Sequence, residues 1–260
     1  MPALAHAAAH HAPALTPSID RSAIPFLSAW IGSWQFSINR KPMAGDELKS
    51  AYDIHATGWS KKLKRLSIQD AYEGMLAHIV ANAPQEREGA HPMCVLDAGV
   101  GAADLSLAFA TVADRKFSLD AFDISPRMLD ESERRLKAQG VTPNLHLADA
   151  TKLPFEDNQF DIIMTAHMLE HLPTPALALR ELIRVLKPGG RLIAFITRRS
   201  MLGYGIQLKW RVHAVTPDIA NNWLSAGGLQ GVHCVERNEK NLLDRLSVVC
   251  VGRKPEAVAV

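Results

Sequence analysis

Residues 95–104, Val-Leu-Asp-Ala-Gly-Val-Gly-Ala-Ala-Asp, decide the fold of this chain. A short apolar strand ends at Asp97, a tight turn passes through Gly99 and Gly101, and a helix follows. Glycine allows such a sharp turn and lets the backbone approach a ligand closely. The tract therefore predicts a binding site where a buried strand meets a helix.

The residue types of this tract narrow the ligand. A dinucleotide fingerprint needs a small residue where Asp104 stands, and a carboxylate there would repel a pyrophosphate. NAD and FAD are therefore disfavoured. Asp97, at the end of the strand, instead suits a ligand that carries a positive group such as an ammonium.

Strands and helices alternate from Pro92 onward, which is the pattern of a parallel sheet with helices on both faces. Ser125-Pro126 and Thr174-Pro175 are expected to begin helices. The second of these helices is expected to carry a core stripe through Leu186 and to end at residues 187–190, Lys-Pro-Gly-Gly. The expected strands cover residues 93–96, 117–122, 144–148, 160–165, 191–197, 232–235 and 246–252, and the last two pair antiparallel.

Three zones follow from this pattern. Residues 1–50 are expected to be an irregular N-terminal tail with an apolar, lid-like segment. Residues 51–88 are expected to form a helical cap, and residues 89–255 the sheet domain.

Carboxylates also end the next two expected strands. Asp123 follows the second strand, where it would accept hydrogen bonds from both hydroxyls of a ribose. Asp149 follows the third strand, where it would reach an adenine amino group. Three acids at consecutive strand ends beside a glycine turn predict a site for an adenosine that bears a positive charge.

Several motifs resemble those of class I S-adenosylmethionine (SAM)-dependent methyltransferases. The similarity extends over residues 90–200 and is closest to the small-molecule group that includes the ubiquinone and menaquinone biosynthesis C-methyltransferases. Ala103 stands where many members have a third glycine. The motifs are VLDAGVGAAD, DISPRML, LADATKLPFEDNQFDIIMTAHMLEHL and LRELIRVLKPGGRLI, preceded by AYDIHATGW at residues 51–59.

The resemblance implies a Rossmann-like α/β fold, with seven strands of which the last is antiparallel. It also implies transfer of a methyl group from SAM to a small-molecule acceptor, with S-adenosylhomocysteine as the product. The implied cofactor contacts come from Tyr52, Trp59, Asp97, Ala98, Gly99, Gly101, Asp123, Ile124, Met128, Asp149, Ala150, Ala166 and His167.

The candidate catalytic residue is His167. Methyl transfer requires alignment and the exclusion of water, and it requires a base only if the nucleophile must lose a proton. His167 follows the fourth expected strand and would titrate in the neutral range; the alternative is that it only lines the pocket. The pair Glu170 and His171 is expected to be structural. Candidate substrate contacts are His55, Tyr204 and His213.

The composition limits the partners. The formal net charge is +2 and the one basic run, residues 61–65, is short, so no nucleic-acid partner is expected. The three cysteines lie in apolar, strand-like segments, which predicts reduced thiols, no disulfide framework and a cytoplasmic protein. They lack metal-ligand spacing, and no metal is predicted.

Residues 23–36 are unusually apolar and aromatic. A lid over the substrate, a homodimer contact and a peripheral membrane contact are all consistent with this composition, although the segment lacks the Lys and Arg of an interfacial helix. A membrane contact would favour a quinone-like or lipid-like acceptor.

Two other functions fit the cofactor site. One is an RNA or protein methyltransferase, although the sequence lacks a basic patch with interleaved aromatic residues. The other is a regulatory protein that binds SAM without transferring its methyl group.

Overall fold

A computed structural model describes a large part of the chain, including the seven strands of the main sheet. Tyr52, His55, Trp59, Tyr204 and His213 lie outside the described residues, so their expected roles stay predictions. The described residues are 27–31, 33–38, 43, 45–47, 49–50, 53, 68–81, 91–200, 212, 214–235 and 242–257.

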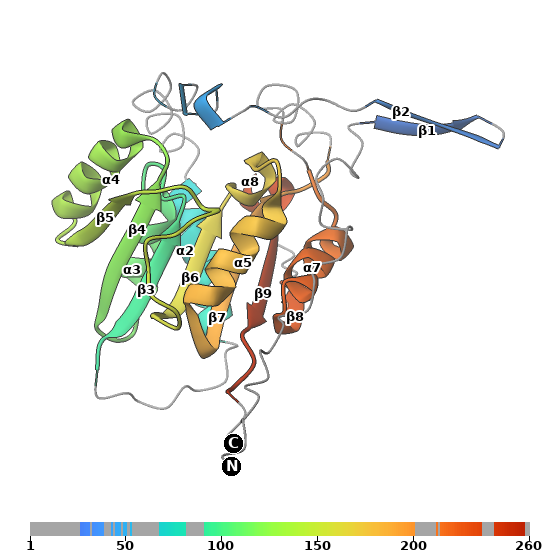
Figure 1. The fold of residues 1–260 in the computed structure, drawn as a ribbon. Helices are drawn as coiled ribbons and strands as arrows, with labels where there is room; N and C mark the ends of the chain where they lie inside the picture. Colours follow the sequence, from blue (N-terminus) through green and yellow to red (C-terminus); the bar gives the residue numbers. More distant parts are fainter. Residues whose placement is uncertain are drawn as a thin grey trace, which may run out of the picture.

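A seven-stranded sheet in the order β5-β4-β3-β6-β7-β9-β8 forms the centre of the fold (Figure 1). The pairs from β5 to β7 are all parallel, whereas β9 runs antiparallel to both β7 and β8. This confirms the predicted sheet with its antiparallel last strand. The strands are β3 Met93–Ala98, β4 Phe117–Asp123, β5 Pro143–Leu147, β6 Phe160–Ala166, β7 Leu186–Thr197, β8 Gln230–Cys234 and β9 Ser247–Arg253.

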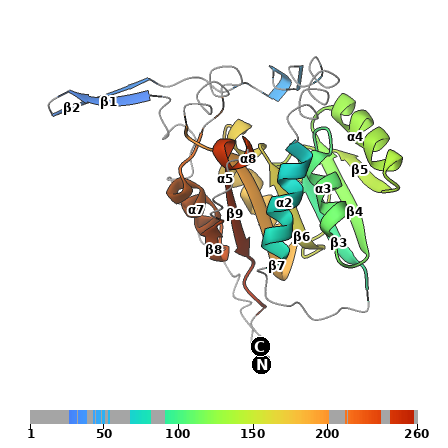
Figure 2. The ribbon, with the colours of Figure 1, turned by 180° about the vertical axis from the view of Figure 1, so that it is seen from behind.

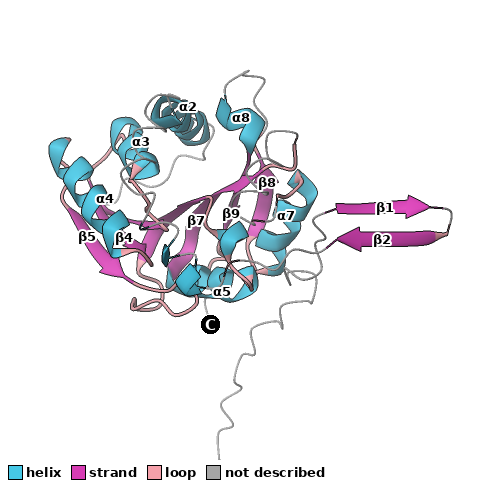
Figure 3. Ribbon diagram, turned by 90° about the horizontal axis from the view of Figure 1, so that it is seen from above, coloured by secondary structure: helices cyan, strands magenta, loops and turns pink. Residues whose placement is uncertain are grey.

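Helices cover both faces of the sheet. Seen from behind and from above, α2, α3 and α8 lie on one face and α5 and α7 on the other (Figures 2 and 3). No helix within the described ranges combines the length and the apolar character that crossing a membrane requires. The helices are α2 Ile68–Ala81, α3 Asp104–Val112, α4 Pro126–Ala138, α5 Pro175–Val185, α7 Pro217–Ala226 and α8 Leu242–Leu246, with a short 3-10 turn, η3, at Leu169–His171.

The inner strands of the sheet are buried on both faces. Successive residues of a strand point to opposite sides, so Val95 and Leu96 of β3 belong to different apolar clusters, and both are fully buried. On the face of Val95, Tyr72 of α2 packs edge-on against Phe195 of β7, with ring centroids 5.0 Å apart. Residues 68–81, expected within a cap, therefore form part of the main core.

The boundary between α5 and β7 differs from the prediction. α5 ends at Val185, and Leu186, expected to continue the core stripe of the helix, is the first residue of β7. Leu186 pairs with Phe160 of β6. It is fully buried, as its apolar character requires, but it is buried in the sheet.

Lys254, just past β9, explains this boundary. Its ammonium lies 2.7 Å from the carbonyl oxygens of both Ile183 and Leu186, at the end of α5. These belong to the helix-end carbonyls that have no partner within the helix, and a cation there also complements the helix dipole. Backbone hydrogen bonds between Lys254 and residues 189 and 190 hold the following turn against the last strand.

A two-stranded hairpin lies in the N-terminal zone that was expected to be irregular. It consists of β1, Leu27–Ile31, and β2, Trp34–Ile38, and it lies apart from the main sheet (Figures 1 and 3). Trp34, beside the turn, is 73% exposed. The division of the chain at residues 50 and 88 stays a prediction.

The expectation of reduced thiols without a disulfide is wrong for one pair. Cys234 of β8 and Cys250 of β9 form a disulfide, with Cα atoms 4.0 Å apart. The antiparallel register makes them direct partners, so their side chains meet on one face. Because disulfides are rare in the cytosol, the cysteines no longer support a cytoplasmic location.

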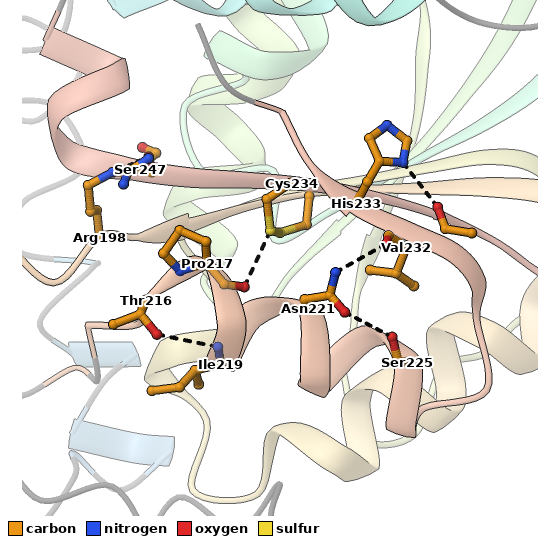
Figure 4. Close-up of a disulfide and its surroundings, with 12 residues drawn as sticks. Arg198, Thr216, Pro217, Ile219, Asn221, Ser225, Val232, His233, Cys234 and Ser247 are labelled. Carbon is orange, nitrogen blue, oxygen red and sulfur yellow. Dashed lines mark hydrogen bonds between the residues drawn. A yellow bond between two sulfur atoms is a disulfide. The ribbon is translucent and has the colours of Figure 1, made fainter.

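The disulfide lies against the first turn of α7 (Figure 4). The sulfur of Cys234 is 3.4 Å from the carbonyl oxygen of Pro217. A thiol would donate a hydrogen bond there, whereas a disulfide sulfur has no hydrogen to donate. Asn221 of α7 donates to the carbonyl of Val232, 3.1 Å away, and so fixes the helix to β8 in either oxidation state.

Candidate cofactor site

The glycine turn lies at the carboxyl end of β3, in the middle of the sheet. Gly99 and Gly101 have φ angles of 76° and 50°, in the left-handed region that glycine tolerates best. Ala103 has a φ of 63° in the same region, which a glycine would adopt more readily than an alanine. The backbone conformation thus accounts for the composition of the tract.

The turn is packed on one side and open on the other. A Cβ atom added to Gly99 would lie 3.0 Å from the side chain of Met168, which follows β6. At Gly101, an added Cβ would meet no atom of the described residues within 4 Å. The open side is where a ligand can approach the backbone closely, as the sequence predicts.

Asp123 is held by the backbone of this turn. Its two carboxylate oxygens accept hydrogen bonds from the N–H groups of Gly101 and Ser125, each 2.9 Å away. Burial raises the pKa of Asp123, while these N–H groups lower it. A carboxylate can accept about four hydrogen bonds, so Asp123 can still accept from a ribose.

Asp97 is the most deeply buried of the acids that end β3, β4 and β5, at 1% exposure. The hydroxyl of Ser106 donates to it over 2.5 Å. Burial raises the pKa of Asp97 to about 7, and the nearby charge of Asp123 contributes to the rise. In the part of the chain that the structure describes, no basic side chain forms an ion pair with Asp97. Its carboxylate thus suits a cationic ligand group.

The remaining predicted cofactor residues surround these two acids. Ala98 and Met128 are buried, and Ile124 is half-buried next to Asp123. Asp149 is exposed two residues after β5, where one of its oxygens accepts from both the N–H and the hydroxyl of Thr151. The strand order brings the ends of β3, β4, β5 and β6 to one edge, and Ala150 and Ala166 lie at the same edge.

Asp53 joins this edge although sequence reasoning did not select it. Its carboxylate accepts a hydrogen bond from the hydroxyl of Ser125, 2.5 Å away, and its carbonyl accepts from Arg127. The contact with Ser125 brings Asp53 close to Asp123, and the charge of Asp53 contributes to raising the pKa of Asp123. Its signal in the sequence is its place within AYDIHATGW.

His167 follows β6 and has a φ of 55°. Its side chain is 31% exposed, whereas that of Glu170 is fully buried. Nδ1 of His167 lies 3.2 Å from a carboxylate oxygen of Glu170 and 3.1 Å from the hydroxyl of Thr197. Nε2 lies 3.2 Å from the hydroxyl of Ser247. The ring is thus contacted by η3, β7 and β9.

The contacts of Glu170 favour its ionised form. Burial opposes ionisation, but the hydrogen bonds from His167 and Thr197, together with the positive charge that His167 and His171 carry when protonated, outweigh it and lower the pKa of Glu170 to about 2. The backbone N–H of Thr197 donates to Glu170 over 2.8 Å and its hydroxyl over 2.6 Å. Sequence reasoning did not identify Thr197 or Ser247, because only the fold brings them to His167.

Together, the strand order, the glycine turn and the acids at the strand ends define a class: Rossmann-like domains of the methyltransferase type. Residues 96–194 match the family model described as "Methyltransferase domain". The match agrees with the predicted fold and with the predicted SAM-dependent class.

Curated relatives match part of the chain. Over 117 residues the chain is 40% identical to the ubiquinone/menaquinone biosynthesis C-methyltransferase UbiE of Vibrio cholerae, covering 44% of this chain and 45% of that protein. Over 101 residues it is 43% identical to UbiE of Azotobacter vinelandii, covering 38% and 40%. The chain thus spans less than half the length of these two relatives.

Solved structures confirm the fold. The CurJ carbon methyltransferase is 14% identical, with a TM-score of 0.60 over 82% of this chain and 59% of that one. The [4+2]-cyclase SpnF is 17% identical, with a TM-score of 0.61 over 84% of this chain and 98% of that one. At these identities the likeness concerns the fold alone.

Proposed function

We propose that this chain transfers a methyl group from SAM to a small-molecule acceptor. The observation that carries the proposal is the buried carboxylate of Asp97 at the glycine turn, without a basic partner among the described residues. An ammonium of the ligand would supply the missing charge, because buried charges require a partner.

The residues at the strand ends fit the rest of the cofactor. Asp97 would pair with the ammonium of the methionine part, Asp123 would accept from the ribose, and the open face above Gly101 would admit the backbone contact. When bound, the sulfonium supplies an activated methyl group. The chain itself must align the acceptor, exclude water and take up a proton where the acceptor carries one.

Cofactor affinity is expected to depend on pH. The pKa of Asp97 is raised to about 7, so this carboxylate loses its charge as the pH falls below 7. The dissociation constant for SAM should therefore rise by about tenfold per pH unit between pH 7 and pH 5. Isothermal titration calorimetry across this range measures the effect. An affinity that stays constant from pH 8 to pH 5 would contradict the assigned partner of Asp97.

The acceptor is proposed to be quinone-like or lipid-like, as the name of the UbiE relatives indicates. SpnF, a [4+2]-cyclase, has the same fold, so binding of SAM alone would not demonstrate methyl transfer. The test therefore measures binding and transfer in two separate steps. Calorimetry with SAM comes first. Release of S-adenosylhomocysteine is then measured with 1,4-naphthohydroquinone, 1,4-benzohydroquinone and phosphatidylethanolamine. If SAM binds but no S-adenosylhomocysteine is released with these acceptors or with pools of cellular metabolites, a regulatory SAM-binding protein is favoured.

We also propose that the hairpin β1–β2 contacts lipid, since Trp34 is exposed beside its turn and residues 27–38 carry no charge. The chain should sediment with phosphatidylcholine vesicles at both low and high salt, because no ionic attraction is involved. Deletion of residues 1–40, or Trp34→Ser, should reduce the bound fraction. Equal sedimentation of all three proteins would remove the lipid contact and leave a lid or a homodimer contact.

A further inference from the structure

The contacts of the His167 ring determine where its hydrogen lies. Thr197 gives its hydroxyl hydrogen to Glu170, 2.6 Å away, so towards the ring this hydroxyl can only accept. Glu170 is a carboxylate and also only accepts. Both groups that face Nδ1 are therefore acceptors, and Nδ1 must carry the hydrogen.

When the ring is neutral, the other ring nitrogen then carries a lone pair. Nε2 faces the hydroxyl of Ser247, which can donate to it over 3.2 Å. Ser247 is 1% exposed, whereas the side chain of His167 is 31% exposed. An incoming molecule can therefore reach the ring, and a donor on that molecule can take the place of the serine hydroxyl.

The ring lies beside the cofactor turn. His167 directly precedes Met168, whose side chain packs against Gly99. Its backbone N–H is bonded to Phe195 of β7, and its φ of 55° is uncommon for a residue other than glycine. Such a backbone persists where surrounding contacts hold it, and it occurs most often at functional sites.

We propose that Glu170 is a positioning residue, which together with Thr197 keeps the hydrogen of His167 on Nδ1 and so presents Nε2 to the methyl acceptor. The inference rests on the proposed function, which supplies an acceptor with a proton to lose. The bond between that proton and the acceptor breaks as an N–H bond forms at Nε2. The resulting imidazolium is paired with the Glu170 carboxylate and later returns its extra proton to water.

This assignment replaces the structural role expected for Glu170. Accepting the backbone N–H of Thr197 is a structural contact that does not require a charge on Glu170. A buried charge opposite a partly exposed imidazole instead stabilises the protonated ring, which an acceptor's proton produces.

Nitrogen NMR of the ligand-free full chain tests the proposal directly. The protein is labelled with ¹⁵N-histidine, and loss of a signal in His167→Gln identifies the ring. At pH 8, Nδ1 of the wild-type protein should give the shift of a nitrogen that bears hydrogen, and Nε2 that of a bare nitrogen. A wild-type ring with its hydrogen on Nε2 overturns the proposal.

Two variants separate positioning from packing. In Glu170→Leu the Thr197 hydroxyl is free to donate to Nδ1, so the ratio of the two tautomers should shift towards hydrogen on Nε2 by about tenfold. In Glu170→Gln the amide oxygen still accepts, and Nδ1 should keep its hydrogen. An unchanged ratio in Glu170→Leu overturns the proposal, and the wild-type spectrum decides if that variant fails to fold.

Failure of this inference is distinguishable from failure of the proposed function. The NMR experiment needs neither cofactor nor acceptor. Calorimetry with SAM on the same wild-type sample reports the proposed function alone. A bound cofactor together with hydrogen on Nε2 removes only the role of Glu170.

Discussion

Asp97→Asn is expected to weaken SAM binding by at least about 30-fold at pH 8, because removal of one member of a buried charge pair costs about 2–5 kcal/mol. Asparagine keeps the size of the side chain and can still accept the hydroxyl of Ser106. Calorimetry at pH 8 measures the loss. Asp120→Asn is a suitable control, since Asp120 pairs with His146 in the middle of β4, and it should leave the affinity unchanged.

The same substitution should stabilise the ligand-free protein. The pKa of Asp97 is about 7 in the folded chain against an ordinary value of 3.8. The unfolded chain therefore ionises this group at a lower pH than the folded chain does, so the folded protein becomes less stable as the pH rises through 7. At pH 8 the variant avoids the burial of this charge. The melting temperature should rise by about 2–4 °C or more, and the gain should shrink below pH 6. A variant that melts below wild type at pH 8 would show that Asp97 serves the fold rather than the ligand.

His167→Ala should lower turnover by about 100-fold or more while SAM affinity stays within a factor of about three, if the acceptor must lose a proton. The reason is that Nε2 faces a serine hydroxyl which an acceptor can replace, whereas the cofactor partners lie on β3 and β4. Initial rates of S-adenosylhomocysteine release, paired with calorimetry, separate the two effects.

His233→Gln provides the matched control, since His233 is an exposed residue of β8 whose ring contacts the carbonyl of Gly231. It should retain full turnover. Wild-type rates in His167→Ala would leave His167 as a residue that only lines the pocket, and the acceptor would then be a nucleophile without a proton to lose.

The cofactor half of the candidate site could be predicted because each of its acids directly follows a strand that is recognisable in the sequence. A glycine turn after a strand fixes where Asp97 lies, and each following strand end places the next acid. The Ser125 cap was predicted in the same way, and its hydroxyl accepts from the N–H of Met128. The alternation of apolar segments was sufficient to locate these strands and helices along the chain.

The other half depends on contacts between distant segments. Ser247 lies 80 positions from His167 in the sequence, and the two meet only because β9 enters the sheet beside β7. The pairing of Cys234 with Cys250 was missed for a similar reason: two antiparallel strands were predicted, but composition alone does not set their register.

The contact between Lys254 and the end of α5 bears on how small a working fragment can be. The family match ends at residue 194, yet this ammonium, 60 positions later, supplies hydrogens to carbonyls inside the match. A fragment cut to residues 96–194 would also lose β9 and expose one edge of β7 to pairing with other chains. Truncation series should therefore keep the C-terminal strand pair and the lysine beyond it, or they will report aggregation instead of cofactor binding.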